Sequence, residues 1–231
     1  SSAGKSSGPI LTTLIANFMY CNEHTPPPVS YLVVDPKPEL CRLSSCGDKW
    51  TRMLDPSAER GTSYGWDPYF GLSKHDPPDV ITDRINVIVS VIVEDSNEDN
   101  AFFQDSARNM LSGALIYEFM VNGSTFIRSL RTILSEDLNS YIRRIKSDPR
   151  CPSQSKMLLS EFGKADDHSN ATEDIKKSLK QRTAVFTRSD TEWFLDPESN
   201  YLMCDPTVLD EHISMFLSIK RADLETYAVL F

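Results

Sequence analysis

The chain has 231 residues, of which 40% are hydrophobic, 10% aromatic and 25% charged. This composition is typical of a folded globular protein and excludes collagen, coiled coil and wholly disordered chains. A net charge of −9 at pH 7 argues against a protein coated in basic surface for gripping nucleic acid. The longest apolar run, residues 85–93, is interrupted by Asn86 and Ser90. It is far shorter than the roughly 20 apolar residues that a membrane-spanning helix needs.

The amino-terminal part predicts a helix followed by a strand. Apolar side chains recur on one face of residues 9–20, which indicates an amphipathic helix that ends before Pro26. Residues 31–34 form a continuous apolar run, typical of a parallel strand that is covered on both faces. Asp35 follows this strand, and ligands of α/β sheets bind beyond the carboxyl ends of strands. We therefore expect Asp35 either to lie beside a nucleotide or to cap the end of the strand.

The middle of the chain changes character. Residues 44–80 are rich in Gly and Pro and predict loops and short strands. Four later stretches have helical periodicity, over residues 79–94, 100–121, 124–147 and 172–186. Within the first of these, the β-branched residues 85–93 are compatible with strand as well as helix. We expect an α/β fold with an all-α region inserted into it.

Residues 213–219 predict a second buried strand, and residues 222–231 begin a further helix. Because the chain stops inside that helix, we expect it to be a piece of a longer protein. The expected organisation is a nucleotide-binding domain in two parts with an insertion between them, over residues 1–73, 74–188 and 189–231.

The five cysteines are irregularly spaced and do not resemble a disulfide framework or a zinc site. We expect reduced thiols. The four histidines are scattered, and the sequence assigns no chemistry to them.

Gly4, Lys5 and Ser6 stand directly before the first predicted helix and match the closing half of a P-loop, G-x-x-x-x-G-K-[ST]. Gly4 lets the backbone turn tightly, so that it and Ser7 can point N–H groups at phosphate oxygens near the helix start. Lys5 is the candidate catalytic residue because it can bridge the β- and γ-phosphates, and Ser6 is the candidate Mg²⁺ ligand. ATP and Mg²⁺ are therefore the expected cofactors, with Asp35 close by. A Ser/Gly-rich chain start without function is the alternative.

A P-loop enzyme also needs an acidic residue at the end of an apolar strand, for Mg²⁺ and the attacking water. Asp210 and Glu211 are candidates, but only two apolar residues separate them from Pro206. We predict a turn or helix start there instead.

Gly4-Lys5-Ser6, with the run Val33-Val34-Asp35-Pro36-Lys37-Pro38-Glu39-Leu40 about thirty residues later, resembles the coupling-protein ATPases of type IV secretion and conjugation (the TraG/TraD group). Pro38 replaces the usual Gly of that family's pattern. Two further short elements, Leu54-Asp55-Pro56 and Trp66-Asp67-Pro68, resemble motifs that follow in the family. Residues 102–111 resemble the opening helix of its inserted domain, and residues 213–231 resemble its return to the nucleotide-binding domain.

The resemblance implies a RecA-like P-loop NTPase domain, parallel-sheeted, with an inserted all-α subdomain. It implies a homo-hexamer at the cytoplasmic face of the bacterial inner membrane that delivers DNA–protein or effector substrates to the secretion channel. Its membrane helices would precede Ser1, and its Walker B acids would follow Phe231. The fragment alone is therefore expected to be inactive.

Charge distribution bears on the partners. Residues 124–188 have a net charge of +5, whereas residues 74–123 have −6. Arg128 with Arg131, and Lys176 with Lys177 and Lys180, fall on common helix faces that can attract phosphate backbones. A solvated helix surface is the alternative, and the sequence favours it. The expected partners are channel components, relaxase or effector proteins, and DNA through these basic faces. The alternatives are another P-loop DNA translocase and a non-catalytic module that docks substrates or adaptors.

Overall fold

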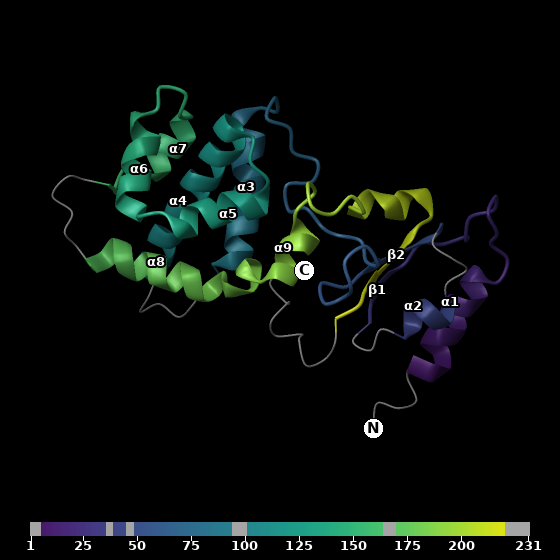
Figure 1. The fold of residues 1–231 in the computed structure, drawn as a ribbon. Helices are drawn as coiled ribbons and strands as arrows, with labels where there is room; N and C mark the ends of the chain where they lie inside the picture. The colour runs from purple at the N-terminus through teal and green to yellow at the C-terminus, as the bar shows by residue number, and fades with distance from the viewer. Residues whose placement is uncertain (1–5, 36–38, 45–48, 94–100, 164–169, 220–231) are drawn as a thin grey trace. The chain divides into compact units, whose positions relative to one another are not determined.

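The computed structural model describes residues 6–35, 39–44, 49–93, 101–163 and 170–219 (Figure 1). The chain divides into two compact units. The α/β unit comprises residues 1–67 and 193–231, and the helical unit comprises residues 68–192. The helical unit is thus an insertion in the sequence of the α/β unit, and its limits lie a few residues from the positions 73/74 and 188/189 suggested by the sequence.

The α/β unit contains three parallel strands, β1 (Leu32–Val34), β2 (Thr51–Leu54) and β3 (Ser214–Leu217), in the spatial order β1-β3-β2. Phe216 of the central strand pairs with Val33 on one side and Met53 on the other. The central strand follows the whole helical unit in the sequence, so the sheet is complete only when the chain returns from that unit. The fold class is α/β with a small parallel sheet and many helices, and both strands expected from apolar runs are present.

Helices cover one face of this sheet. An irregular first turn, η1 (Ser6–Ile10), leads into α1 (Leu11–Phe18), and α2 (Leu40–Ser44) follows β1. Their apolar side chains form a core with the central strand, made of Leu14, Phe18, Leu40, Cys41 and Phe216. The sequence pattern predicted α1 but not the five-residue α2.

On the opposite face of β1, the described residues leave two side chains exposed. Leu32 and Val34 each expose 59% of their surface, whereas Met215 and Leu217 on the same face of β3 are buried. The part of the chain that the structure describes therefore does not supply the cover expected on this side of β1. A continuous apolar run indicates a strand, but it does not reveal whether a covering layer exists.

The helical unit is built around one buried helix. It contains α3 (Pro78–Ile92), α4 (Ala101–Tyr117) with its extension η3 (Glu118–Asn122), α5 (Phe126–Ser135), α6 (Leu138–Ser147), α7 (Ser153–Leu158), α8 (Asn170–Arg182) and η4 (Ala184–Thr187). Helix α4 contacts α3, α5, α6, α7 and α8. Its residues Met110, Leu111 and Leu115 are completely buried, and all three belong to the apolar stripe of this helix.

Two boundaries in this unit follow from local chemistry. The stretch 124–147 forms two helices rather than one, because the Asp137 side chain accepts a hydrogen bond from the Ser140 N–H at 2.9 Å and caps α6. Gly123 ends η3 at a φ of 65°, a conformation that favours glycine. Residues 85–92 are helical, so their β-branched content does not decide their structure.

Two further elements complete the described chain. Helix α9 (Ser189–Leu195) spans the boundary between the units, and η5 (Pro206–Glu211) precedes β3. The helix expected over 222–231 lies outside the described residues. Among the ranges that the structure describes, no helix is long and apolar enough to cross a membrane. Cys21 is disulfide-bonded, so the expectation of reduced thiols is wrong at this position.

Candidate functional site

The structure describes part of the sequence-predicted phosphate loop. Gly4 and Lys5 lie outside the described residues. The backbone of Ser6 and Ser7 begins η1, an irregular turn with a kink at Gly8, and regular helix begins with α1 at Leu11. Gly8 within this turn has non-helical backbone angles (φ −98°, ψ −118°), and Pro9 follows it. The regular helix thus begins after this kinked turn, and phosphate binding by the loop stays a prediction.

The direction of α1 follows from contacts at its end. Beyond the helix, the Asn22 carbonyl accepts a hydrogen bond of 2.7 Å from the Trp50 indole, and Trp50 immediately precedes β2. The end of α1 thus lies near the amino ends of the strands. Since α1 packs along the sheet, its start is directed toward their carboxyl ends, where a phosphate held at Ser6 and Ser7 would lie.

Three polar residues follow the three strands at this carboxyl edge. Asp35 follows β1, Asp55 follows β2 and Ser218 follows β3. The backbone pairing extends to them, because Asp35 N–H donates to the Leu217 carbonyl and Ser218 N–H donates to the Leu54 carbonyl, each at 2.9 Å. All three are buried, with exposed fractions of 1%, 7% and 0%.

The two carboxylates have local structural partners. One oxygen of Asp35 accepts the Leu40 N–H at 2.8 Å, so Asp35 joins β1 to the start of α2. One oxygen of Asp55 accepts both the Ser57 N–H at 2.9 Å and the Ser57 hydroxyl at 2.7 Å. The hydrogen bond from Leu40 to Asp35 supports the alternative in which Asp35 has a structural role at the end of β1. Its placement beside a nucleotide stays a prediction.

Ser218 differs from its neighbours. Its hydroxyl is buried and has no hydrogen-bond partner in the part of the chain that the structure describes. The sequence reasoning did not single out Ser218 or Asp55 as members of this edge. In the sequence, both residues directly follow the apolar end of a strand, and this was the signal that could have identified them. Only the order of the strands in the sheet shows that they lie beside Asp35.

The rival acidic pair is elsewhere. Asp210 and Glu211 belong to η5 and are exposed, and η5 precedes β3. The neighbouring Leu209 carbonyl accepts a 2.6 Å hydrogen bond from Ser30, which lies just before β1. This pair is therefore at the amino edge of the sheet, and the prediction of a turn or helix start is confirmed.

No cluster of three or more His, Cys, Asp or Glu side chains that suits a metal ion occurs among the described residues. The proposed Mg²⁺ ligand, Ser6, has a described backbone but no described side chain. An ion bound to a nucleotide needs few protein ligands, because phosphates and water fill most of its coordination positions. The carboxyl edge of the sheet has two carboxylates, those of Asp35 and Asp55, and no complete set of metal ligands among the described residues.

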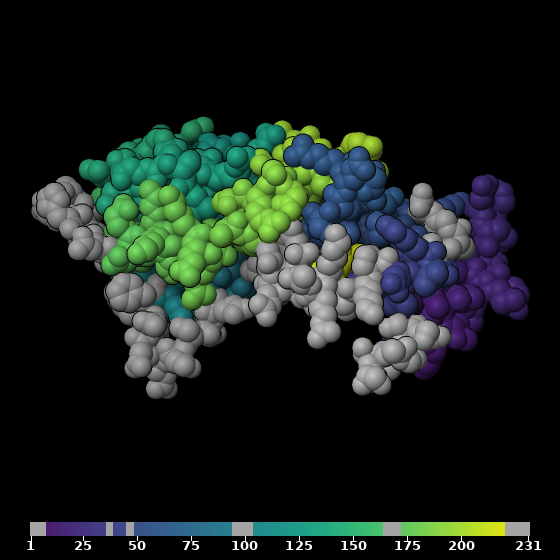
Figure 2. Space-filling model, turned by 60° about the horizontal axis from the view of Figure 1, so that its bottom comes forward, coloured from purple at the N-terminus to yellow at the C-terminus, as the bar shows by residue number. Residues whose placement is uncertain are grey.

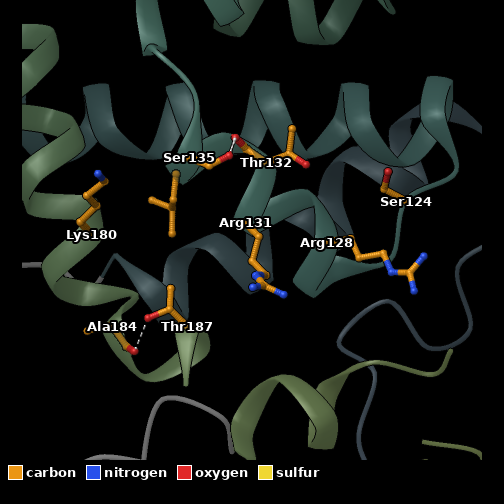
Figure 3. Close-up of a pocket in the computed structure, with 9 residues that line it drawn as sticks. Ser124, Arg128, Arg131, Thr132, Ser135, Lys180, Ala184 and Thr187 are labelled. Atoms are coloured by element: carbon orange, nitrogen blue, oxygen red, sulfur yellow. Dashed lines mark hydrogen bonds between the residues drawn. The ribbon is translucent and has the colours of Figure 1, made fainter. Parts of the chain in front are cut away.

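A second candidate site lies within the helical unit. A pocket of about 820 Å³, which we call the α5–α8 groove, is lined by Ser124, Arg128, Arg131, Thr132, Leu134, Ser135, Lys180, Ala184 and Thr187. Figure 3 shows the guanidinium groups of Arg128 and Arg131 directed to the same side of α5, with Lys180 across the groove on α8. Figure 2 presents α8 and η4 in green on the surface of this unit.

The groove brings together side chains that the sequence had placed on two separate basic faces. Arg131 forms an ion pair with Glu192, which holds its guanidinium at the groove. Lys176, from the same sequence face as Lys180, donates instead to the Glu136 carbonyl at 2.7 Å. Helix periodicity identified these charges, but the packing of α5 against α8 decided which of them share a pocket.

Comparison with known proteins adds no assignment. No family model matches the chain, and no curated protein sequence matches it.

Proposed function

We propose that this chain is the nucleotide-binding region of a coupling-protein ATPase of the TraG/TraD type. The α/β unit would be RecA-like and bind ATP with Mg²⁺. The observation that supports the proposal is the direction of α1, which begins at Leu11 after the irregular turn η1 and has its start toward the carboxyl edge that bears Asp35. The helical unit inserted between β2 and β3 agrees with the family's organisation.

Each residue has a separate proposed role. Lys5 binds the phosphates as a point charge, and the backbone of Gly4 and Ser7 adds N–H donors at the helix start. Ser6 supplies one hydroxyl ligand, and Mg²⁺ when bound neutralises phosphate charge. Asp35 joins the end of β1 to the start of α2 through its bond to Leu40 and would lie near the bound nucleotide. Phosphoryl transfer of this kind depends on positioning and charge neutralisation.

The partners follow from the resemblance and remain part of the proposal. The whole protein would act as a hexamer at the cytoplasmic face of the inner membrane and deliver relaxase–DNA or effector substrates to a type IV secretion channel. The basic faces within residues 124–188 would then meet DNA or an acidic protein. Disulfides are rare in the reducing cytoplasm, so the disulfide at Cys21 argues against a cytoplasmic location. Labelling of free thiols in protein taken from cells tests whether Cys21 is oxidised there.

The test is Lys5→Ala, assayed by the anisotropy of a fluorescent ATP analogue and by ATP hydrolysis in the full-length protein. Because the substitution removes a charged contact to the phosphates, we expect affinity to fall by about tenfold or more. Lys74→Ala, at an exposed loop position, is the matched control and should bind normally. Unchanged affinity in Lys5→Ala would defeat the assignment and favour a non-catalytic docking module.

A further inference from the structure

The parallel sheet of the α/β unit has one face that its described helices cover and one that they leave partly exposed. Val33, Phe216 and Met53 are paired across the three strands, and all three pack in the core under α1 and α2. The residues before and after them belong to the opposite face, because successive side chains of a strand alternate. On that face, Leu32 and Val34 of β1 each expose 59% of their surface.

Such exposure is unusual for strands of this kind. Parallel sheets occur almost only where layers cover both faces, because their strands are apolar on both faces. On the neighbouring strand β3, Met215 and Leu217 pair with Leu32 and Val34 and are only 1% and 8% exposed. Among the described strand residues, the exposed apolar side chains of this face are therefore those of β1. An apolar element that lies over β1 would complete the layer.

Residues 222–231 have the sequence pattern of such an element. They follow the central strand β3 and lie outside the described residues. Apolar residues recur there at spacings of three and four, at Leu224, Tyr227, Ala228 and Phe231. This spacing predicts a helix with one apolar face. A helix over this range is about 15 Å long, whereas a strand as short as β1 spans about 10 Å.

The connection from β3 limits where this helix can lie. The described chain continues beyond β3 to Ile219, which is buried, so only Lys220 and Arg221 precede the predicted helix. These two residues add at most about 7 Å of reach, so the helix starts close to the carboxyl end of β3. Neighbouring strands are about 4.8 Å apart and a helix is about 10 Å wide, so a helix over β3 also reaches β1. On the other face of the sheet, α1 and α2 already occupy this position.

We propose that residues 222–231 form a helix that packs its apolar face against Leu32 and Val34 of β1. The occupant of this face is thus a segment of the same chain, and it gives the sheet its second covering layer. The helix runs back from the carboxyl edge of the sheet, antiparallel to the strands. This inference concerns the packing of the α/β unit and does not rest on the proposed ATP binding.

The first test is photo-crosslinking of the full chain from one introduced residue. Val34→p-benzoylphenylalanine places a photoreactive group at an exposed position of β1. Irradiation should join it to residues 222–231 of the same molecule, as mass spectrometry of the monomer band can show. Leu43→p-benzoylphenylalanine is the matched control, because Leu43 is also 59% exposed but lies on α2. The control should form no crosslink to residues 222–231.

Hydrogen exchange followed by mass spectrometry is the second measurement. Leu224→Ser/Tyr227→Ser disrupts the predicted apolar face, and we expect the amides of β1 to exchange about tenfold faster or more, because large apolar side chains no longer cover the strand. Asp223→Ser/Glu225→Ser is the control, because it changes two residues of the same segment that lie off this face. The control should leave the exchange of β1 unchanged.

A crosslink from position 34 to residues 222–231, with faster exchange of β1 in the apolar-face variant alone, supports the proposal. The proposal is overturned if position 34 forms no such crosslink, whether it reacts with a second copy, with another segment or with nothing. It is also overturned if residues 222–231 exchange as fast as an unfolded peptide, or if both double variants change the exchange of β1 by the same factor.

Discussion

The helical unit and the α/β unit bury their apolar residues in different ways. In the helical unit, α4 is enclosed by five other helices, and several of its side chains have no exposed surface. In the α/β unit, α1 and α2 cover one face of a three-stranded sheet, while Leu32 and Val34 remain open on the other face of β1. The comparison teaches that the inserted unit has a complete core of its own, whereas the described sheet has a complete core on one side only.

The largest expected effect comes from truncating each core separately. Leu111→Ala in α4 and Phe216→Ala in β3 both remove a fully buried side chain, and each should lower the free energy of unfolding of its unit by about 3 kcal/mol or more. Hydrogen exchange followed by mass spectrometry can assign the loss of protection. We expect each variant to loosen its own unit first. Equal loosening of both units by Leu111→Ala would show that they unfold together.

A smaller effect is expected from the buried polar network of the helical unit. Glu118 is 3% exposed, and one of its oxygens accepts the Tyr141 hydroxyl at 2.7 Å. Its other oxygen accepts the Asn122 amide at 2.8 Å. Burial and the Glu118 carboxylate raise the pKa of Tyr141 well above its usual range, so it remains a donor.

Tyr141→Phe removes that donor and leaves a buried carboxylate oxygen without its bond. We expect a loss of about 1 to 3 kcal/mol in chemical denaturation. Tyr201→Phe is the control, because Tyr201 is 84% exposed in the α/β unit and its variant should unfold at the same denaturant concentration as the parent. A Tyr141→Phe protein as stable as the parent would mean that the network contributes nothing to this core.

The smallest expected effect is a pH dependence confined to the helical unit. Hydrogen bonds from the Arg150 side chain and backbone, and from the Tyr117 hydroxyl, hold the pKa of Asp148 well below its usual range. The same contact, with burial, raises the pKa of Tyr117 to about 12. A carboxyl whose pKa is lower in the folded state stabilises the fold above its unfolded pKa, and this stabilisation is lost as the pH falls.

The melting temperature of the helical unit should therefore fall as the pH drops below about 4, the ordinary pKa of aspartate. Asp148→Asn should make this fall shallower. Asp105→Asn, at an exposed position on α4, should leave the pH dependence as it is in the parent protein. An identical acid dependence in parent and Asp148→Asn would show that other carboxyls control it.

Part of the candidate site could be anticipated from the sequence, because some of its features are local. Gly4-Lys5-Ser6 precedes an amphipathic pattern, and Asp35 follows an apolar run. Both facts depend on neighbours in the chain. That Asp55 and Ser218 lie at the same edge depends on which strands pair, and no short-range pattern carries that information. The α5–α8 groove could likewise not be predicted from the sequence, because it forms only where α5 packs against α8.

The sequence by itself predicted α1, most helices of the inserted unit and both apolar strands, but not α2 or α9. It could do so because helical hydrogen bonds join residues four apart and side-chain periodicity records which face is buried. The phosphate chemistry that it predicts for the amino-terminal loop stays a prediction. Only the tertiary structure decided that β3 inserts between β1 and β2 and that the described residues leave two side chains of β1 uncovered. The physical reason is distance along the chain: strand pairing and helix packing join residues separated by up to the length of the inserted unit, and their free energy depends on partners that no local window contains.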